Sequence, residues 1–220
     1  MDDKSVGREV EIVLDGTSHR GMLNVPYETQ GIVLFAHGSG SSSHSPRNRY
    51  VASVIQDAGI ATLLFDLLTE EEDRVYETRF DIELLTRRLC GATAWVTQQK
   101  HLQHLAVGYF GASTGAAAAL KAAAALGKGI GAVVSRGGRP DLAAPELPRV
   151  QAPALLIVGG YDDVVIKLNR SAYRQLQCTK ELQIIPGATH LFEEPGALEQ
   201  AAVLAAKWFV KHLTGIPQVK

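Results

Sequence analysis

The sequence predicts an α/β fold, in which helices cover both faces of a mostly parallel β-sheet. Three observations predict it: a β-hairpin pattern near the start of the chain, short apolar runs without alternation, and longer amphipathic runs between them. Strands that are buried on both faces of a sheet are apolar along their whole length, as these short runs are. Residues 1–220 read as a single domain because no linker, repeat or shift in composition divides them.

The first elements are two alternating, β-rich segments, Arg8–Asp15 and Ser18–Val25. Gly16 lies between them and Pro26 follows the second, which is the signal of a hairpin. The apolar runs that follow predict the remaining strands at Ile32–Ala36, Ala61–Phe65, Leu105–Phe110, Ala132–Ser135, Ala154–Val158 and Leu182–Ile185. In a parallel sheet of this kind, function gathers in the loops at the carboxyl ends of the strands.

Two stretches carry apolar residues at spacings of three and four, so each predicts a helix with one apolar face toward the core. The first stripe consists of Ile82, Leu85, Leu89, Ala92 and Val96, and the second of Leu198, Ala201, Ala205, Trp208 and His212. Further helices are expected from an alanine-rich run that begins near Ala112 and from a segment that begins near Val164. Cys90 and Cys178 also fall in stretches that read as helices.

Composition excludes several classes of protein. With 22 Lys and Arg against 23 Asp and Glu, the formal net charge is −1, whereas a general nucleic-acid binder carries a basic excess. Two cysteines cannot form a disulfide framework or a cysteine-based zinc site, and they suit a reducing compartment. The pattern at the N-terminus is not that expected of a signal peptide, and no apolar run approaches the length of a spanning helix. We therefore expect a cytoplasmic protein that binds neither membrane nor nucleic acid.

The strongest motif is Gly111-Ala112-Ser113-Thr114-Gly115, which follows a predicted strand and opens the alanine-rich helix. This is G-x-S-x-G in its required strand–turn–helix context. The glycines leave room for a tight turn that lifts the Ser113 hydroxyl above the sheet. The backbone N–H of Thr114, at the helix N-terminus, then faces an oxygen that becomes negative during attack. The motif predicts that Ser113 is a catalytic nucleophile.

A serine nucleophile needs a base and an acid that orients the base, in the chain order Ser, acid, His. His190 is the predicted base because it follows the last strand, whereas His212 lies on the second helical stripe. Asp162, after the strand that ends at Val158, is the preferred acid. Its neighbour Asp163 is the alternative and otherwise caps the next helix, and Asp141 is a distant third.

The second oxyanion donor is expected in the loop after the first buried strand, His37-Gly38-Ser39-Gly40. The backbone N–H of Ser39 is the candidate. His37 and Asp66 precede Ser113 in the chain, so both are interpreted as structural residues near the site. The glycines of this loop do not form a phosphate-binding motif, because neither a G-K-[S/T] ending nor a third glycine follows.

These motifs resemble the α/β-hydrolase superfamily, in particular predicted serine hydrolases that are similar to dienelactone hydrolases. The resemblance covers nearly the whole chain and rests on the loop at residues 37–40, the Ser113 motif, Gly159-Gly160-Tyr161-Asp162 and Gly187-Ala188-Thr189-His190. Ser45–Tyr50 and Ser135–Asp141 also resemble a bacterial subgroup of these hydrolases. Dienelactone hydrolases proper use a cysteine nucleophile, so the serine at position 113 departs from them.

The resemblance implies an α/β/α sandwich with an eight-stranded sheet, whose second strand is antiparallel, and no large lid. In some relatives this unit is fused to a phosphoribosyltransferase-like domain, which these 220 residues do not contain. We interpret the chain as a serine esterase that needs no cofactor or metal and acts on small-molecule esters, lactones or thioesters. An acyltransferase with the same triad and a non-catalytic binding module of the same fold are the alternative functions. A homodimer is a possible assembly.

Several arginines are expected near the carboxyl ends of the strands, where they could bind an anionic part of the substrate. They are Arg47, Arg49, Arg79, Arg136 and Arg139. The competing interpretation is that they cap helices and pair with the acidic run at 70–73. The first interpretation requires that at least one of these arginines faces Ser113 and favours an ester or lactone with a negatively charged group.

Overall fold

The computed structural model describes residues 7–214. Its strands form one eight-stranded sheet in the order β1-β2-β4-β3-β5-β6-β7-β8, which confirms the predicted fold class. They are β1 (Arg8–Leu14), β2 (Thr17–Asn24), β3 (Gly31–Ala36), β4 (Ala61–Phe65), β5 (Ala106–Ala112), β6 (Ala132–Arg136), β7 (Ala154–Gly159) and β8 (Lys180–Ile185). β2 pairs antiparallel with β1 and β4, whereas the six strands from β3 to β8 are parallel to one another.

The hairpin that joins β1 to β2 turns at Asp15 and Gly16, whose φ angles are 48° and 81°. A two-residue hairpin turn of the I′ type requires positive φ at both central positions, which Asp and Gly tolerate. Leu14 pairs with Thr17 directly across the turn. The hairpin signal in the sequence therefore predicted both strands to within a residue.

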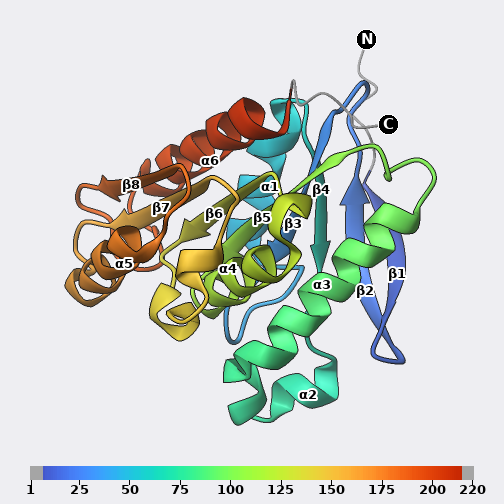
Figure 1. The fold of residues 1–220 in the computed structure, drawn as a ribbon, viewed down its shortest axis with the longest axis horizontal. Helices are drawn as coiled ribbons and strands as arrows, with labels where there is room; N and C mark the ends of the chain where they lie inside the picture. The colour runs from blue at the N-terminus through green and yellow to red at the C-terminus, as the bar shows by residue number, and fades with distance from the viewer. Residues whose placement is uncertain (1–6, 215–220) are drawn as a thin grey trace.

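Helices cover both faces of the sheet (Figure 1). The main helices are α1 (Pro46–Asp57), α3 (Ile82–Gln98), α4 (Thr114–Leu126), α5 (Asp163–Gln175) and α6 (Ala197–Leu213). One apolar core packs α3, α4 and α5 against one face, and the other packs α1 and α6 against the opposite face. β3, β4 and β7 are buried along their whole length, as the non-alternating apolar runs predicted.

One local prediction was wrong, and one short helix was not predicted. Cys178 lies in the bend between α5 and β8, because α5 already ends at Gln175; Cys90 does lie in α3. A short helix, α2 (Glu70–Arg74), occupies the acidic run at 70–73. Thr69 caps α2 reciprocally with Glu72 in a capping box, which the T-x-x-E spacing signals.

None of the helices between residues 7 and 214 has the length and apolar character that a bilayer-spanning helix requires. No large lid covers the carboxyl edge of the sheet within the same residues. That edge carries the loops after β3, β5, β6, β7 and β8, which contain the residues singled out in the sequence.

Candidate active site

Ser113 stands at the turn from β5 to α4 in a strained backbone conformation, with φ 51° and ψ −121°. A positive φ is uncommon for a residue other than glycine, and such strain persists only where surrounding contacts fix it. Two backbone hydrogen bonds do so here. The Ser113 N–H donates to the carbonyl of Arg136 at 3.2 Å, and the Arg139 N–H donates to the carbonyl of Ser113 at 3.1 Å.

The glycines around Ser113 are required by close packing. A Cβ at Gly115 would lie 2.1 Å from the carbonyl oxygen of Ala36, and one at Gly111 would lie 2.4 Å from Cα of Ala116. A Cβ at Gly38 would approach Cβ of Ser113 to 3.0 Å. The loop after β3 therefore lies directly against the turn that carries Ser113.

Asp162 and His190 are in direct contact. Nδ1 of His190 lies 2.7 Å from Oδ2 of Asp162, whose side chain is largely buried. The other carboxylate oxygen, Oδ1, accepts a hydrogen bond from the backbone N–H of Val165 at 3.3 Å. Asp162 is therefore the N-cap of α5, and the expectation that Asp163 caps this helix was wrong. Asp163 is the first helical residue.

The residues at the end of β6 lie next to both the Ser113 turn and the loop that carries His190. Gly137 follows Arg136, whose carbonyl binds the N–H of Ser113, and a Cβ at Gly137 would lie 3.5 Å from Nδ1 of His190. Ser113 Oγ makes no hydrogen bond to His190 among the described residues, so only the His190–Asp162 pair is in contact. Hydrogen bonds to a nucleophile often tighten only once substrate is bound.

The two expected oxyanion donors lie beside each other. The Ser39 N–H donates to Oγ1 of Thr114 at 3.0 Å, and Thr114 is buried at the first position of α4. The Ser39 N–H is therefore already occupied by a hydroxyl. An oxyanion at this position would have to replace Thr114 Oγ1 as its acceptor or share the donor with it.

His37 and Asp66 brace the loop after β3, as the sequence predicted. Nε2 of His37 accepts the N–H of Leu67 at 3.0 Å, so Nδ1 carries the proton and donates to the carbonyl of Gly38 at 3.1 Å. Burial lowers the pKa of His37, which favours this neutral form. Oδ1 of Asp66 accepts the N–H of Ser43 at 2.7 Å. Asp141, the third candidate acid, instead receives two hydrogen bonds from Arg139, at 2.9 and 2.7 Å.

Four of the five arginines have partners within the protein. The contacts are Arg47–Glu193 at 2.9 Å, Arg49–His44 at 2.6 Å, Arg79–Asp73 at 3.2 Å and the bidentate pair Arg139–Asp141. These contacts support structural roles for the four arginines, but only Arg79 pairs with the acidic run at 70–73, and the other three have partners elsewhere. The sequence offered no signal for the Arg47–Glu193 pair, which joins segments far apart in the chain.

Arg136 is the exception. It ends β6 and is only 8% exposed, with its guanidinium 5.9 Å from the ring centre of Phe110 and 5.7 Å from that of Phe192. Its Nε and Nη1 atoms are buried and have no hydrogen-bond acceptor among the described residues. Burial lowers the pKa of Arg136 to about 10, and nearby Arg47 adds to that effect. A charged group in such surroundings normally has a partner.

Comparison with known proteins gives a consistent result. The model of the dienelactone hydrolase family matches residues 25–213. A crystal structure of a dienelactone hydrolase from Anabaena variabilis is 57% identical, with a TM-score of 0.94 over 96% of this chain and 99% of that one. Est1E from Butyrivibrio proteoclasticus shares the fold, with a TM-score of 0.80 at 15% identity over 94% of this chain and 98% of that one.

A relative in Mycobacterium tuberculosis bears the name "Putative phosphoribosyl transferase Rv0571c". It is 58% identical over 207 residues, which are 94% of this chain and 47% of the relative. The chain therefore spans about half the length of the curated relative that it matches.

Proposed function

The chain belongs to the dienelactone hydrolase family of α/β hydrolases, and from that premise we propose that it hydrolyses carboxylic esters through an acyl-enzyme on Ser113. The observation that carries the proposal is the 2.7 Å contact between His190 Nδ1 and Asp162 Oδ2. A carboxylate at Nδ1 holds the proton there, so Nε2 is left as the basic nitrogen.

In the proposed reaction, His190 Nε2 takes the proton of Ser113 while Oγ attacks the carbonyl carbon. The N–H groups of Thr114 and Ser39 stabilise the oxyanion, for which Ser39 gives up its bond to Thr114 Oγ1. When the tetrahedral intermediate collapses, the alcohol leaves with the proton from His190. Water then attacks the acyl-enzyme with His190 as base, and the acid and free Ser113 are formed.

The test is labelling with a fluorophosphonate, which reacts with an activated serine. We expect one equivalent to attach to the peptide that contains Ser113, with loss of p-nitrophenyl acetate hydrolysis in proportion. A non-catalytic binding module would leave Ser113 unlabelled. Acyl transfer to another acceptor would give labelling as well, but the acyl group would pass mainly to an added alcohol or amine rather than to water.

We assign the phosphoribosyl transfer in the name of the mycobacterial relative to the part of that protein outside the matched region. The part of this chain that is similar to the mycobacterial relative is also the part that the hydrolase family model covers. We therefore expect no phosphoribosyl transfer from this chain.

A further inference from the structure

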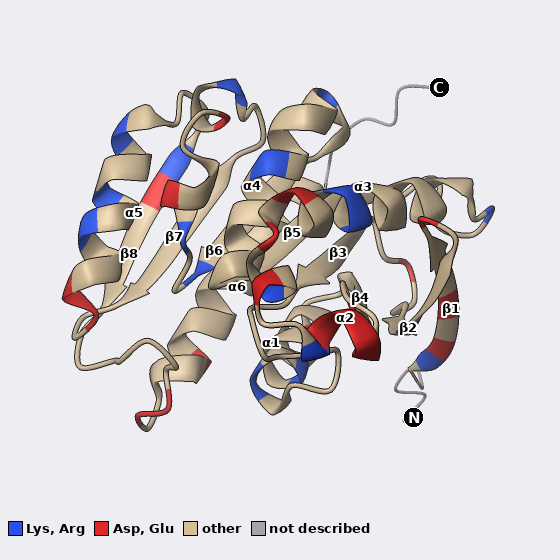
Figure 2. Cartoon of the chain, turned by 90° about the horizontal axis from the view of Figure 1, so that it is seen from below, with Lys and Arg blue, Asp and Glu red and all other residues tan. Residues whose placement is uncertain are grey.

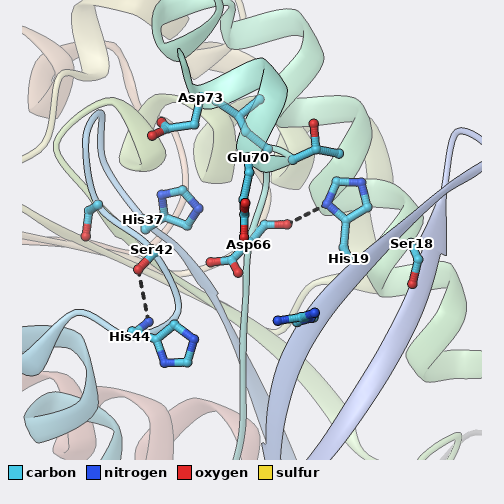
Figure 3. Close-up of a pocket in the computed structure, with 12 residues that line it drawn as sticks. Ser18, His19, His37, Ser42, His44, Asp66, Glu70 and Asp73 are labelled. Carbon is cyan, nitrogen blue, oxygen red and sulfur yellow. Dashed lines mark hydrogen bonds between the residues drawn. The ribbon is translucent and has the colours of Figure 1, made fainter. Parts of the chain in front are cut away.

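A polar pocket of about 370 Å³ lies beside the loop after β3 (Figure 3). One wall is the start of β2 with Ser18 and Arg20, the second is the loop with His37 and Ser41, and the third comes from α2 and the end of β4. Figure 3 shows Glu70 descending from α2 toward the strand end that carries Asp66. We call this the β2–β4 pocket. Its volume is room for roughly a dozen water-sized groups.

The side chains of the β2–β4 pocket are almost all polar. Leu68 is the one apolar side chain among the 12 residues that line it, and the others offer hydroxyl, imidazole, guanidinium or carboxylate groups. Most small-molecule pockets are lined mainly by apolar side chains. An alkyl chain would gain little here and would displace water from polar groups, which is unfavourable.

Several polar side chains of the pocket are already hydrogen-bonded within the protein, so fewer of them are available to bind a ligand. His37 uses both ring nitrogens, and His19 contacts the carbonyl of Asp66 and the Arg88 side chain. By contrast, the exposed side chains of Arg20 and Glu70 have no hydrogen bond or ion pair among the described residues.

A guanidinium can donate to two neighbouring oxygens, and a carboxylate can accept from two neighbouring hydroxyls. The pocket also contains both signs of charge, since Asp66 and Glu70 are acidic and Arg20 is basic. Figure 2 shows the acidic band along α2 next to scattered basic residues. This combination suits an uncharged group that carries several hydroxyls better than a carboxylate or an ammonium group.

The β2–β4 pocket and Ser113 lie against the same loop. His37 lines the pocket, and the next residue, Gly38, is packed against Ser113. The Ser41 N–H donates to the carbonyl of Gly38 at 3.1 Å, so the loop is compact between the two. Only a few loop residues therefore separate the pocket from Ser113.

The order of the strands decides which half of an ester would enter the pocket. β4 and β2 lie on one side of β3 and β5, whereas β7 and β8, which carry Asp162 and His190, lie on the other. In the proposed reaction His190 gives its proton to the departing alcohol, so the alcohol lies on the β8 side. The acyl group then points toward the β2–β4 pocket.

We propose that the β2–β4 pocket binds the acyl part of the substrate and that this part is polyhydroxylated, as in an aldonic acid. This inference rests on the proposed function, since it assigns a specificity to the same esterase. Glu70 and Arg20 bind the hydroxyls, and neither takes part in the chemical step.

The experiment compares methyl gluconate with methyl hexanoate, which share the alcohol and the number of acyl carbons. Hydrolysis is followed by acid release, and the rate without enzyme is subtracted. We expect kcat/KM to be at least about tenfold higher for the gluconate ester. Glu70→Gln or Arg20→Gln should lower kcat/KM for methyl gluconate by about tenfold, mainly through KM, with methyl hexanoate unchanged, because each removes a charge-assisted hydrogen bond.

The matched controls are Glu71→Gln and Arg74→Gln, which remove the same charges from exposed positions of α2 outside the pocket. They should leave the preference intact.

Equal rates for the two esters, or a preference that Glu70→Gln and Arg20→Gln do not change, would overturn the pocket assignment while esterase activity stands. A second pair of esters, glycerol monoacetate and propyl acetate, carries the hydroxyls on the alcohol instead. A preference for hydroxyls that appears only with this pair would place them in the alcohol part and would also overturn the pocket assignment. Failure to hydrolyse any of these esters, together with failure to label Ser113, would instead remove the proposed function.

Discussion

Asp162 uses its two carboxylate oxygens for two separate purposes. Oδ2 contacts His190 and Oδ1 caps α5. The backbone turn at Gly159-Gly160 directs this side chain, and not that of Asp163, toward His190. The placement of the proposed acid therefore depends on one position in the turn after β7.

Asp162→Asn should lower kcat for p-nitrophenyl acetate by on the order of 10⁴, as in the best-studied triad, because the amide no longer holds the proton at Nδ1 of His190. An asparagine remains a good N-cap, so thermal stability should change little. The matched variant Asp163→Asn should have near-normal activity. A large loss from Asp163→Asn with none from Asp162→Asn would move the acid by one residue.

Arg136 should favour an ester that carries a carboxylate on its alcohol part, because β6 lies on the His190 side of Ser113 and two buried guanidinium nitrogens have no acceptor within residues 7–214. Two esters matched in size, one neutral and one with a distal carboxylate, should be compared at low and high salt. We expect the charged ester to have the higher kcat/KM at low salt, and this advantage to shrink as ions screen the charges.

Arg136→Met should abolish this charge preference, and Arg139→Met should retain it, since Arg139 is already bound to Asp141. If the neutral ester is the better substrate of the wild type at both salt concentrations, Arg136 has a purely structural role between its two aromatic rings.

Individual residues differed in how far the sequence could predict them. The tight turn at Ser113 and the need for its glycines were predictable because the constraint is local: five residues between a strand and a helix. The partners of Arg47 and Arg139, and the hydroxyl that occupies the Ser39 N–H, depend on tertiary distances that no local pattern encodes.

At the scale of elements, the site depends on how closely α4 approaches the end of β3. Gly115 makes this approach possible, because its Cα lies against the backbone carbonyls of Ala36 and His37. A side chain there cannot be accommodated by rotating a neighbouring side chain, since the obstructing atoms belong to the backbone.

Gly115→Ala should therefore lower the free energy of unfolding by about 1–3 kcal/mol, as overpacking does, and reduce esterase activity by displacing Thr114 from Ser39. Urea unfolding and p-nitrophenyl acetate turnover measure the two effects. Gly129→Ala is the control, because the nearest atom to its new Cβ lies 3.9 Å away. Equal stability of the two variants would show that the α4–β3 contact is not tight.

The sequence predicted the strands better than the short helices. Buried parallel strands are marked by continuous apolar runs, and all of them were located to within a few residues. The five residues of helix α2 are all charged and none is buried, so the helix has no apolar stripe. Only its capping box could have revealed it. The pocket next to it could not be predicted, since it requires β2, α2 and the loop after β3 to be placed together.

At the scale of the whole molecule, buried imidazoles link stability to pH. Burial lowers the pKa of His19, His37 and His212 below the ordinary value of 6.5. Around and below that pH the unfolded chain binds more protons at these side chains than the folded protein does. Unfolding then takes up protons, so the free energy of unfolding falls as the pH falls.

We expect urea unfolding to show lower stability at pH 5.5 than at pH 7.5, with His212→Asn making the dependence on pH shallower. Each such imidazole contributes at most about 1.4 kcal/mol per pH unit. Stability that is constant or rises as the pH falls from 7.5 to 5.5 would contradict lowered pKa values for these histidines in the folded protein.

The proposed reaction is tested most directly by the turnover of p-nitrophenyl acetate by Ser113→Ala protein. The substitution removes one oxygen from a turn held by backbone hydrogen bonds, so circular dichroism and the thermal midpoint should stay close to those of the wild type. We predict a loss in kcat on the order of 10⁶, with a residual rate still roughly 10³-fold above that of water. Near wild-type turnover by the folded variant would contradict Ser113 as the nucleophile.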